Sequence, residues 1–220
     1  MSKASTILLV VMLVFGAAVA EAQTTLSAKD AGRYAEITVG ATAGHAVGAV
    51  VGGEFGWPLS LSWDVFGEAG RMFNTRTAAM DSAATVIAAY LTDVSGGAAS
   101  YVAKQPSTYF DVGMRYKFPT TGRFDPYAEM GIGAAKVSRN VTFTVNGADA
   151  TAQLLDTFGV QLGSDLSGSE TKALVTLGVG ARFHLFRPLF GDVSYRYGHV
   201  FLTDAGLNTN RLQFGVGLRF

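Results

Sequence analysis

Apolar and polar residues alternate along most of the chain, in segments of similar length. In the last segment every second position from Leu212 to Phe220 is apolar, and the positions between them are polar or glycine. Successive side chains of a β-strand point to opposite faces, so this pattern gives one apolar face and one polar or small face. The same pattern predicts eight strands, at residues 35–43, 47–55, 59–69, 108–118, 127–137, 171–185, 189–199 and 211–220.

The connections between these segments alternate in length. Gly56–Pro58, Pro119–Asp125 and Phe186–Pro188 are short and carry turn residues, whereas residues 74–106 and 138–170 are long connections. The segments have about the 9 to 11 residues that a tilted transmembrane strand needs, and isolated strands are viable in a bilayer only when the sheet closes. The sequence therefore predicts an all-β fold, a closed antiparallel transmembrane β-barrel of about eight strands.

Two details of the long connections stay open. Residues Thr77–Leu91 have the composition of a short amphipathic helix. Asn146-Gly147, flanked by apolar runs, is typical of a type I′ hairpin turn. If residues 141–154 enter the membrane, the barrel has ten strands instead of eight.

The N-terminal segment resembles a cleavable export signal. Lys3 supplies a positive charge, residues 7–20 are apolar, and Ala20-Glu21-Ala22 forms a small-x-small cleavage site. We expect residues 1–22 to be a signal peptide and residues 23–220 to form the barrel domain. The alternative is an uncleaved membrane anchor.

Composition narrows the class of function. Lys+Arg and Asp+Glu number 17 each, so the chain has no net charge, and it contains no Cys. A nucleic-acid-binding surface would need a basic patch or stripe, so no nucleic acid partner is expected. The absence of Cys excludes disulfides, Cys-based zinc sites and Cys nucleophiles.

The strand alternation also assigns side chains to the inside or outside of the barrel. Aromatic residues at the strand ends are interpreted as an interfacial girdle, namely Tyr34, Trp57, Phe118, Tyr127, Phe186, Phe190 and Phe220. Charges on the inward parity should pair across strands, because isolated charges in a narrow interior are costly. We expect these charges to form a polar plug and not a wide pore: Glu36, Glu54, Asp64, Glu68, Asp111, Arg115, Lys117, Glu129, Arg182, His184, Asp192, Arg196 and Arg219.

Several motifs in this order suggest a family. They are Gly52–Gly56, Pro126–Gly133, Tyr195–Tyr197 and Gly215–Phe220. The chain resembles the small outer-membrane β-barrel superfamily that includes opacity-type surface proteins and the barrel of outer membrane protein A. The resemblance implies a bacterial outer-membrane location, short periplasmic turns and two long extracellular loops.

The resemblance also implies partners. The barrel assembly machinery of this family reads a terminal signal, which here matches Phe214, Val216, Leu218 and Phe220. Outer-membrane lipid is a further expected partner. The loops at 74–106 and 138–170 would contact an extracellular ligand or a host surface.

Catalytic chemistry finds little support in the sequence. Lipid A deacylases, which are also small barrels, place a serine two residues after a histidine, but Phe201 stands there after His199. Asp204 and Asn208 near this histidine are more typical of a turn than of a metal site. We expect no enzyme activity, metal or cofactor, and interpret the chain as a structural surface barrel. A small-solute channel or hydrophobic-ligand-binding barrel is the alternative, and a lipid A-modifying hydrolase is a third.

Overall fold

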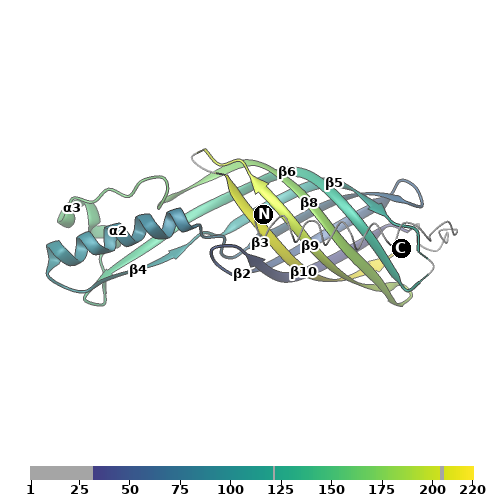
Figure 1. Cartoon of the computed structure of the whole chain (residues 1–220), viewed down its shortest axis with the longest axis horizontal. Helices are drawn as coiled ribbons and strands as arrows, with labels where there is room; N and C mark the ends of the chain where they lie inside the picture. Colours follow the sequence, from purple (N-terminus) through teal and green to yellow (C-terminus); the bar gives the residue numbers. More distant parts are fainter. Residues whose placement is uncertain (1–31, 121, 204–205) are drawn as a thin grey trace, which may run out of the picture.

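The computed structural model describes residues 32–120, 122–203 and 206–220, so the expected signal peptide lies outside the described residues. Eight antiparallel strands pair side by side into a closed ring (Figure 1). β1 pairs with β10, and β6 pairs with β8, which closes the ring. The predicted eight-stranded barrel is confirmed, and its strands are β1 (Tyr34–Ala43), β2 (Gly48–Pro58), β3 (Trp63–Met72), β5 (Ser107–Lys117), β6 (Phe124–Val145), β8 (Gly168–Phe186), β9 (Leu189–Val200) and β10 (Leu207–Arg219).

Strand alternation separates the two surfaces of the ring. On β1, Tyr34, Glu36 and Thr38 are buried inside, whereas Ile37 and Val39 are exposed on the outer surface. No helix among the described residues is long and apolar enough to cross a membrane. The ring thus has a polar interior and an apolar outer band.

One turn differs from the prediction. β2 continues through the whole of Gly56–Pro58 and pairs there with β3, and the chain reverses at residues 59–62 instead. Ser60 Oγ accepts hydrogen bonds from the backbone N–H groups of Ser62 and Trp63, at 3.3 and 3.1 Å. A serine that binds the amides of a turn stabilises the reversal at that point, so the proline occupies the strand end.

β6 continues past the ring. It pairs with β8 as far as Arg139 and then runs on to Val145. In this outer part it pairs with β4 (Ala99–Lys104) and with the two-residue strand β7 (Ala148–Asp149). The long connections are therefore extensions of the sheet in part, and not loops throughout.

The outer end of β6 turns at the predicted hairpin. Asn146 and Gly147 have positive φ values of 51° and 80°, which a type I′ turn requires of its two central residues. The strands on either side of this turn lie beyond the ring. The segment 141–154 therefore adds no strand to the barrel.

The connection after β3 holds the 18-residue helix α2 (Ala78–Ser95). The Thr77 side chain accepts a hydrogen bond from the N–H of Met80 at 3.3 Å, and Gly96 ends the helix in the left-handed conformation. The predicted helix over Thr77–Leu91 is confirmed and is about one turn longer.

The helix and the outer strands project beyond one end of the barrel (Figure 1). They enclose a hydrophobic core of their own, outside the barrel. We call this part of the molecule, residues 74–106 and 138–167, the cap. It also contains the 3-10 turn η2 (Thr151–Gln153) and the short helix α3 (Leu154–Phe158). The buried residues of its core come from α2, β4, β6, α3 and the segment before β8: Met80, Ala84, Ala88, Leu91, Ala103, Val141, Phe143, Leu154 and Leu166.

Polar contacts attach the cap to the mouth of the ring. Asp81 at the start of α2 contacts His45 Nε2, in the β1–β2 connection, at 2.7 Å. Glu170 accepts hydrogen bonds from Arg139 at 2.6 Å and from Thr203 at 3.0 Å.

Candidate functional site: the charged interior and the two mouths

A row of carboxylates crosses one wall of the barrel. Glu36, Glu54, Glu68 and Asp111 lie on β1, β2, β3 and β5, and each stands directly opposite the next in the strand register. All four point inward and are at most 6% exposed. Buried carboxylates are costly unless they are paired, so the interior needs basic side chains at this level.

Arg115 on β5 is the central basic residue. Its guanidinium donates to Glu129 at 2.6 and 2.9 Å and to Glu54 at 2.9 Å. It also donates to the hydroxyl of Tyr34 at 2.7 Å and lies 4.1 Å from the ring centre of Tyr127. Arg115 is completely buried, and its planar guanidinium donates hydrogen bonds to two carboxylates at the same time.

Arg196 and Arg211 bind the carboxylates from the opposite wall. Arg196 on β9 contacts Glu54 and Glu129 at 2.5 Å each, and it also contacts Glu68. Arg211 on β10 faces Arg196 in the strand register and contacts Glu68 at 3.2 Å. Arg211 is absent from the network predicted from sequence, although its inward parity is the same signal that identified the other members.

Further pairs surround this centre. Arg182 on β8 contacts Asp192 and Glu54 at 3.3 Å each and Glu36 at 3.4 Å. The remaining contacts are Lys117 with Asp64 at 2.6 Å and Thr176 with Asp111 at 2.7 Å. Eleven of the thirteen predicted side chains therefore lie inside the barrel, and these contacts link them across it.

The other two predicted members, His184 and Arg219, lie at the rim. Arg219 Nη1 donates to His184 Nε2 at 2.7 Å, and Asp125 lies 3.5 Å from Arg219 and 3.6 Å from His184. His184 precedes a register shift in the β8–β9 pairing, and Arg219 is the last residue of β10. Because both strands end here, inward parity places these side chains at the mouth and not in the interior.

Three aromatic residues assigned to the girdle face inward instead. Tyr34, Tyr127 and Phe190 are each 1% exposed. Each ring covers a glycine directly opposite on the neighbouring strand, and Tyr109 does the same. The interior has room for these rings because glycine has no side chain, and an inward aromatic opposite a glycine is a signal visible in the sequence once the register is known. The four pairs are Tyr34 with Gly56, Tyr109 with Gly70, Tyr127 with Gly180, and Phe190 with Gly217.

The last strand presents the predicted assembly signal on its outer face. Phe214, Val216, Leu218 and Phe220 are between 49% and 67% exposed. They form a continuous apolar row along β10, on the lipid-facing side. An assembly factor could reach this row only before the strand is surrounded by lipid.

His199 lies on the outer face of β9, near the mouth that carries the cap. Its Nδ1 is 2.6 Å from Asn208 Oδ1, and its ring packs edge-on against Phe201 at 4.6 Å. Asp204, considered above as a metal ligand, lies outside the described residues. Within the described part of the chain, no group of three or more His, Cys, Asp or Glu side chains is placed to hold a metal ion.

Comparison with known proteins accords with this architecture. The family model described as outer membrane protein beta-barrel domain matches residues 7–220. This chain belongs to that outer-membrane β-barrel family. Its location is therefore the bacterial outer membrane. Short turns of such barrels face the periplasm and long connections face the cell exterior, so we expect the turns next to the chain end on the periplasmic side and the cap on the extracellular side. No curated protein matches the sequence.

Solved structures of outer-membrane β-barrels resemble the chain at low identity. Neisserial surface protein A matches with a TM-score of 0.54 and 12% identity, over 86% of this chain and 96% of that one. OprG from Pseudomonas aeruginosa gives 0.49 and 12%, over 86% and 96%. The outer membrane enzyme PagL gives 0.42 and 14%, over 85% and 99%. At such identities the likeness shows the fold alone.

We expect the outer-membrane barrel to give no steady conductance in planar lipid bilayers. An eight-stranded barrel is only wide enough for its own side chains, and Arg115 and Arg196 bridge carboxylates across the interior. A triple variant with serine at Glu54, Arg115 and Arg196 removes this bridge and should show openings. Reproducible steady channels from the unchanged protein would contradict the plug.

Proposed function

We propose that this protein is a non-enzymatic outer-membrane barrel that displays its folded cap at the cell exterior as an interaction surface. The observation that carries the proposal is the separate hydrophobic core of the cap, in which Leu91 and Phe143 are completely buried. A connection that merely joins two strands needs no such core. Binding residues are commonly carried by connections that a rigid scaffold positions.

The outer face of α2 supplies a surface for contact. Val86, Tyr90 and Val94 follow one another at four-residue spacing and are 69%, 46% and 53% exposed. Leu155 on α3 is also exposed. Residues four apart share one face of a helix, so these side chains form an apolar stripe of the kind that marks interaction sites.

The surroundings of His199 support the non-enzymatic assignment. A hydrolase would need a hydroxyl nucleophile beside the histidine and a carboxylate to orient it. Here an amide oxygen of Asn208 is the partner of Nδ1, and the phenyl ring of Phe201 packs against the imidazole. Phe201 stands two residues after His199, where lipid A deacylases place a serine, and its side chain has no nucleophilic atom.

The proposal includes export and assembly steps. Residues 1–22 act as a cleaved signal peptide, and the outward row ending at Phe220 is read by the barrel assembly machinery. The exposed apolar outer band, of which Ile37 at 72% exposure is an example, contacts membrane lipid.

Whole-cell attachment tests this function. Cells that display the protein should attach to at least one immobilised surface in a panel of extracellular-matrix proteins and heparin. The triple variant Val86→Ser/Tyr90→Ser/Val94→Ser should lose most of that attachment, because it removes the apolar stripe while keeping the buried face of α2. The matched control Ser82→Ala/Asp93→Ser changes other exposed positions of the same helix and should attach normally. Equal attachment with and without the cap, on every surface, would refute the proposal.

A further inference from the structure

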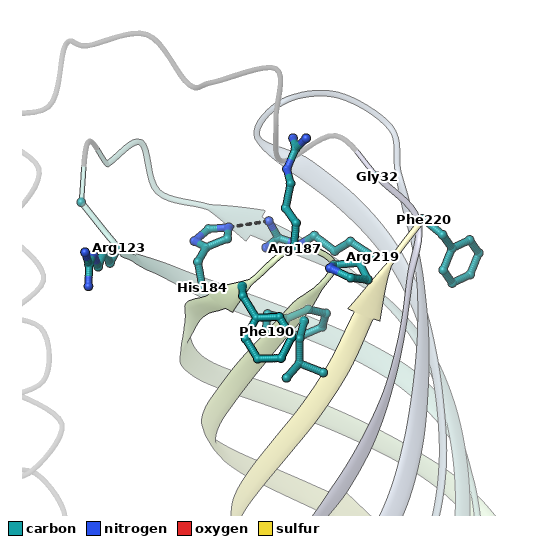
Figure 2. Close-up of a pocket in the computed structure, with 11 residues that line it drawn as sticks. Gly32, Arg123, His184, Arg187, Phe190, Arg219 and Phe220 are labelled. Atoms are coloured by element: carbon teal, nitrogen blue, oxygen red, sulfur yellow. Dashed lines mark hydrogen bonds between the residues drawn. The ribbon is translucent and has the colours of Figure 1, made fainter.

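The periplasmic mouth of the barrel holds a half-open pocket of ≈ 600 Å³ (Figure 2). It is formed where β6 begins, where β8 turns into β9, and where β10 ends beside the residues before β1. Pockets that bind small ligands commonly have volumes of roughly 300–1,000 Å³. The space is therefore large enough for a molecular fragment and not only for water.

Basic side chains surround this pocket. Arg123, Arg187 and Arg219 come from three separate segments and line it together with His184. In Figure 2 the side chains of Arg123 and Arg187 stand at the edge of the mouth, apart from the Arg219–His184 pair. Asp125 is the acidic side chain near them, and it contacts Arg219 and His184. Among the described residues, Arg123 and Arg187 have no carboxylate within ion-pair distance.

The ring of Phe190 lies between the pocket and the charged interior of the barrel. Phe190 is 1% exposed, and the guanidinium of Arg182 lies 4.8 Å from its ring centre on the interior side. Arg219 lies 5.3 Å from the same ring. Arg123 and Arg187 are thus not partners of the carboxylate row, and their charge is available to a ligand at the mouth.

Exposed aromatic residues flank the pocket on the lipid side. Phe186 and Phe220 both line it and are 68% and 67% exposed. Phe220 also packs against Phe55 on the outer surface, with ring centres 6.3 Å apart. Aromatic side chains at strand ends lie at the level of the lipid headgroups. The pocket therefore opens where headgroups of the periplasmic leaflet are found.

We propose that this pocket binds the headgroup phosphate of an anionic phospholipid from the periplasmic leaflet. The paired N–H donors of an arginine guanidinium match the geometry of phosphate oxygens. Arg123 and Arg187 provide two such guanidinium groups, from separate segments of the chain. Leu189, Phe186 and Phe220 provide apolar surface for the start of the acyl chains. A soluble anion would use the arginines but would gain nothing from these apolar side chains.

Native mass spectrometry of the purified barrel in detergent tests the assignment. Dioleoylphosphatidylglycerol should be retained in preference to dioleoylphosphatidylcholine, whose headgroup has no net charge. The variant Arg123→Gln/Arg187→Gln should bind phosphatidylglycerol about 25-fold more weakly, because each basic residue near an anionic lipid surface contributes roughly a fivefold gain. Inorganic phosphate should fail to displace the bound lipid.

Lys104→Gln/Lys136→Gln is the matched control, since it removes the same charge at the other end of the molecule and should leave lipid binding unchanged. Heat-modifiable gel mobility verifies that each variant is folded. Equal retention of the two lipids, or equal binding by the Arg123→Gln/Arg187→Gln variant and the unchanged protein, would overturn the proposal. Displacement by inorganic phosphate would identify the ligand as a free anion and overturn the lipid assignment.

Discussion

Replacement of Arg115 by methionine is expected to lower the free energy of unfolding of the barrel by roughly 3–5 kcal/mol. Methionine leaves Glu54 and Glu129 buried without the guanidinium that lies 2.6 to 2.9 Å from their oxygens. Urea titration in phospholipid vesicles measures the loss, and the fluorescence of Trp57 and Trp63, the two tryptophans of the chain, reports unfolding.

Two companion variants make this test specific. Lys136→Met removes an exposed basic residue from β6, and its effect should stay within about 0.5 kcal/mol. The double variant Arg115→Met/Glu129→Leu also removes one of the two carboxylates that lose their contact with Arg115, so its loss should be smaller than the sum of the two single losses. An Arg115→Met barrel as stable as the unchanged one would show that the charge network contributes nothing to stability.

Replacement of Phe143 by aspartate is expected to unfold the cap while the ring stays closed. Deleting a buried phenylalanine side chain costs about 3–5 kcal/mol, and a buried carboxylate without a partner adds to that loss. The cap has only a small core, so it should become open to proteases. Trypsin added to intact cells should then cleave within the cap at Lys104 or Arg139, whereas the unchanged protein should resist cleavage there.

The control for this variant is Val102→Asp on β4. Val102 is 57% exposed, so the same substitution there should leave the cap resistant to trypsin. Both variants should keep the heat-modifiable mobility of a folded barrel. Trypsin resistance of Phe143→Asp cells equal to that of unchanged cells would show that the cap does not depend on its core.

The ring could be predicted because its evidence is local. A strand that separates lipid from a polar interior must alternate at period two, and β10 from Leu212 to Phe220 shows this in its sequence alone. Closure then follows from the need to satisfy the backbone in a bilayer. The same parity assigned most of the interior charges, because a charged residue in such a strand has only one acceptable side.

The cap and the inward aromatics depend on contacts between distant residues. β4 pairs with β6 across about 40 positions of sequence, for instance Ala103 with Val141, and no local pattern specifies this partner. From the sequence alone, Tyr34 and Tyr127 are typical of an interfacial girdle. Only the strand register shows that each lies opposite a glycine and faces inward. Strand ends were the other source of error, because His184 and Arg219 keep the inward parity but lie where the walls end.

The pairing of β4 with β6 also sets an order for translocation. Residues 74–106 and 138–167 are separated by β5 and the lower part of β6, so they cross the membrane as two segments. Leu91 and Phe143 can be buried in one core only after both segments have arrived outside. Folding of the cap then opposes the return of either segment, so the hydrophobic effect at the cell surface favours completed export.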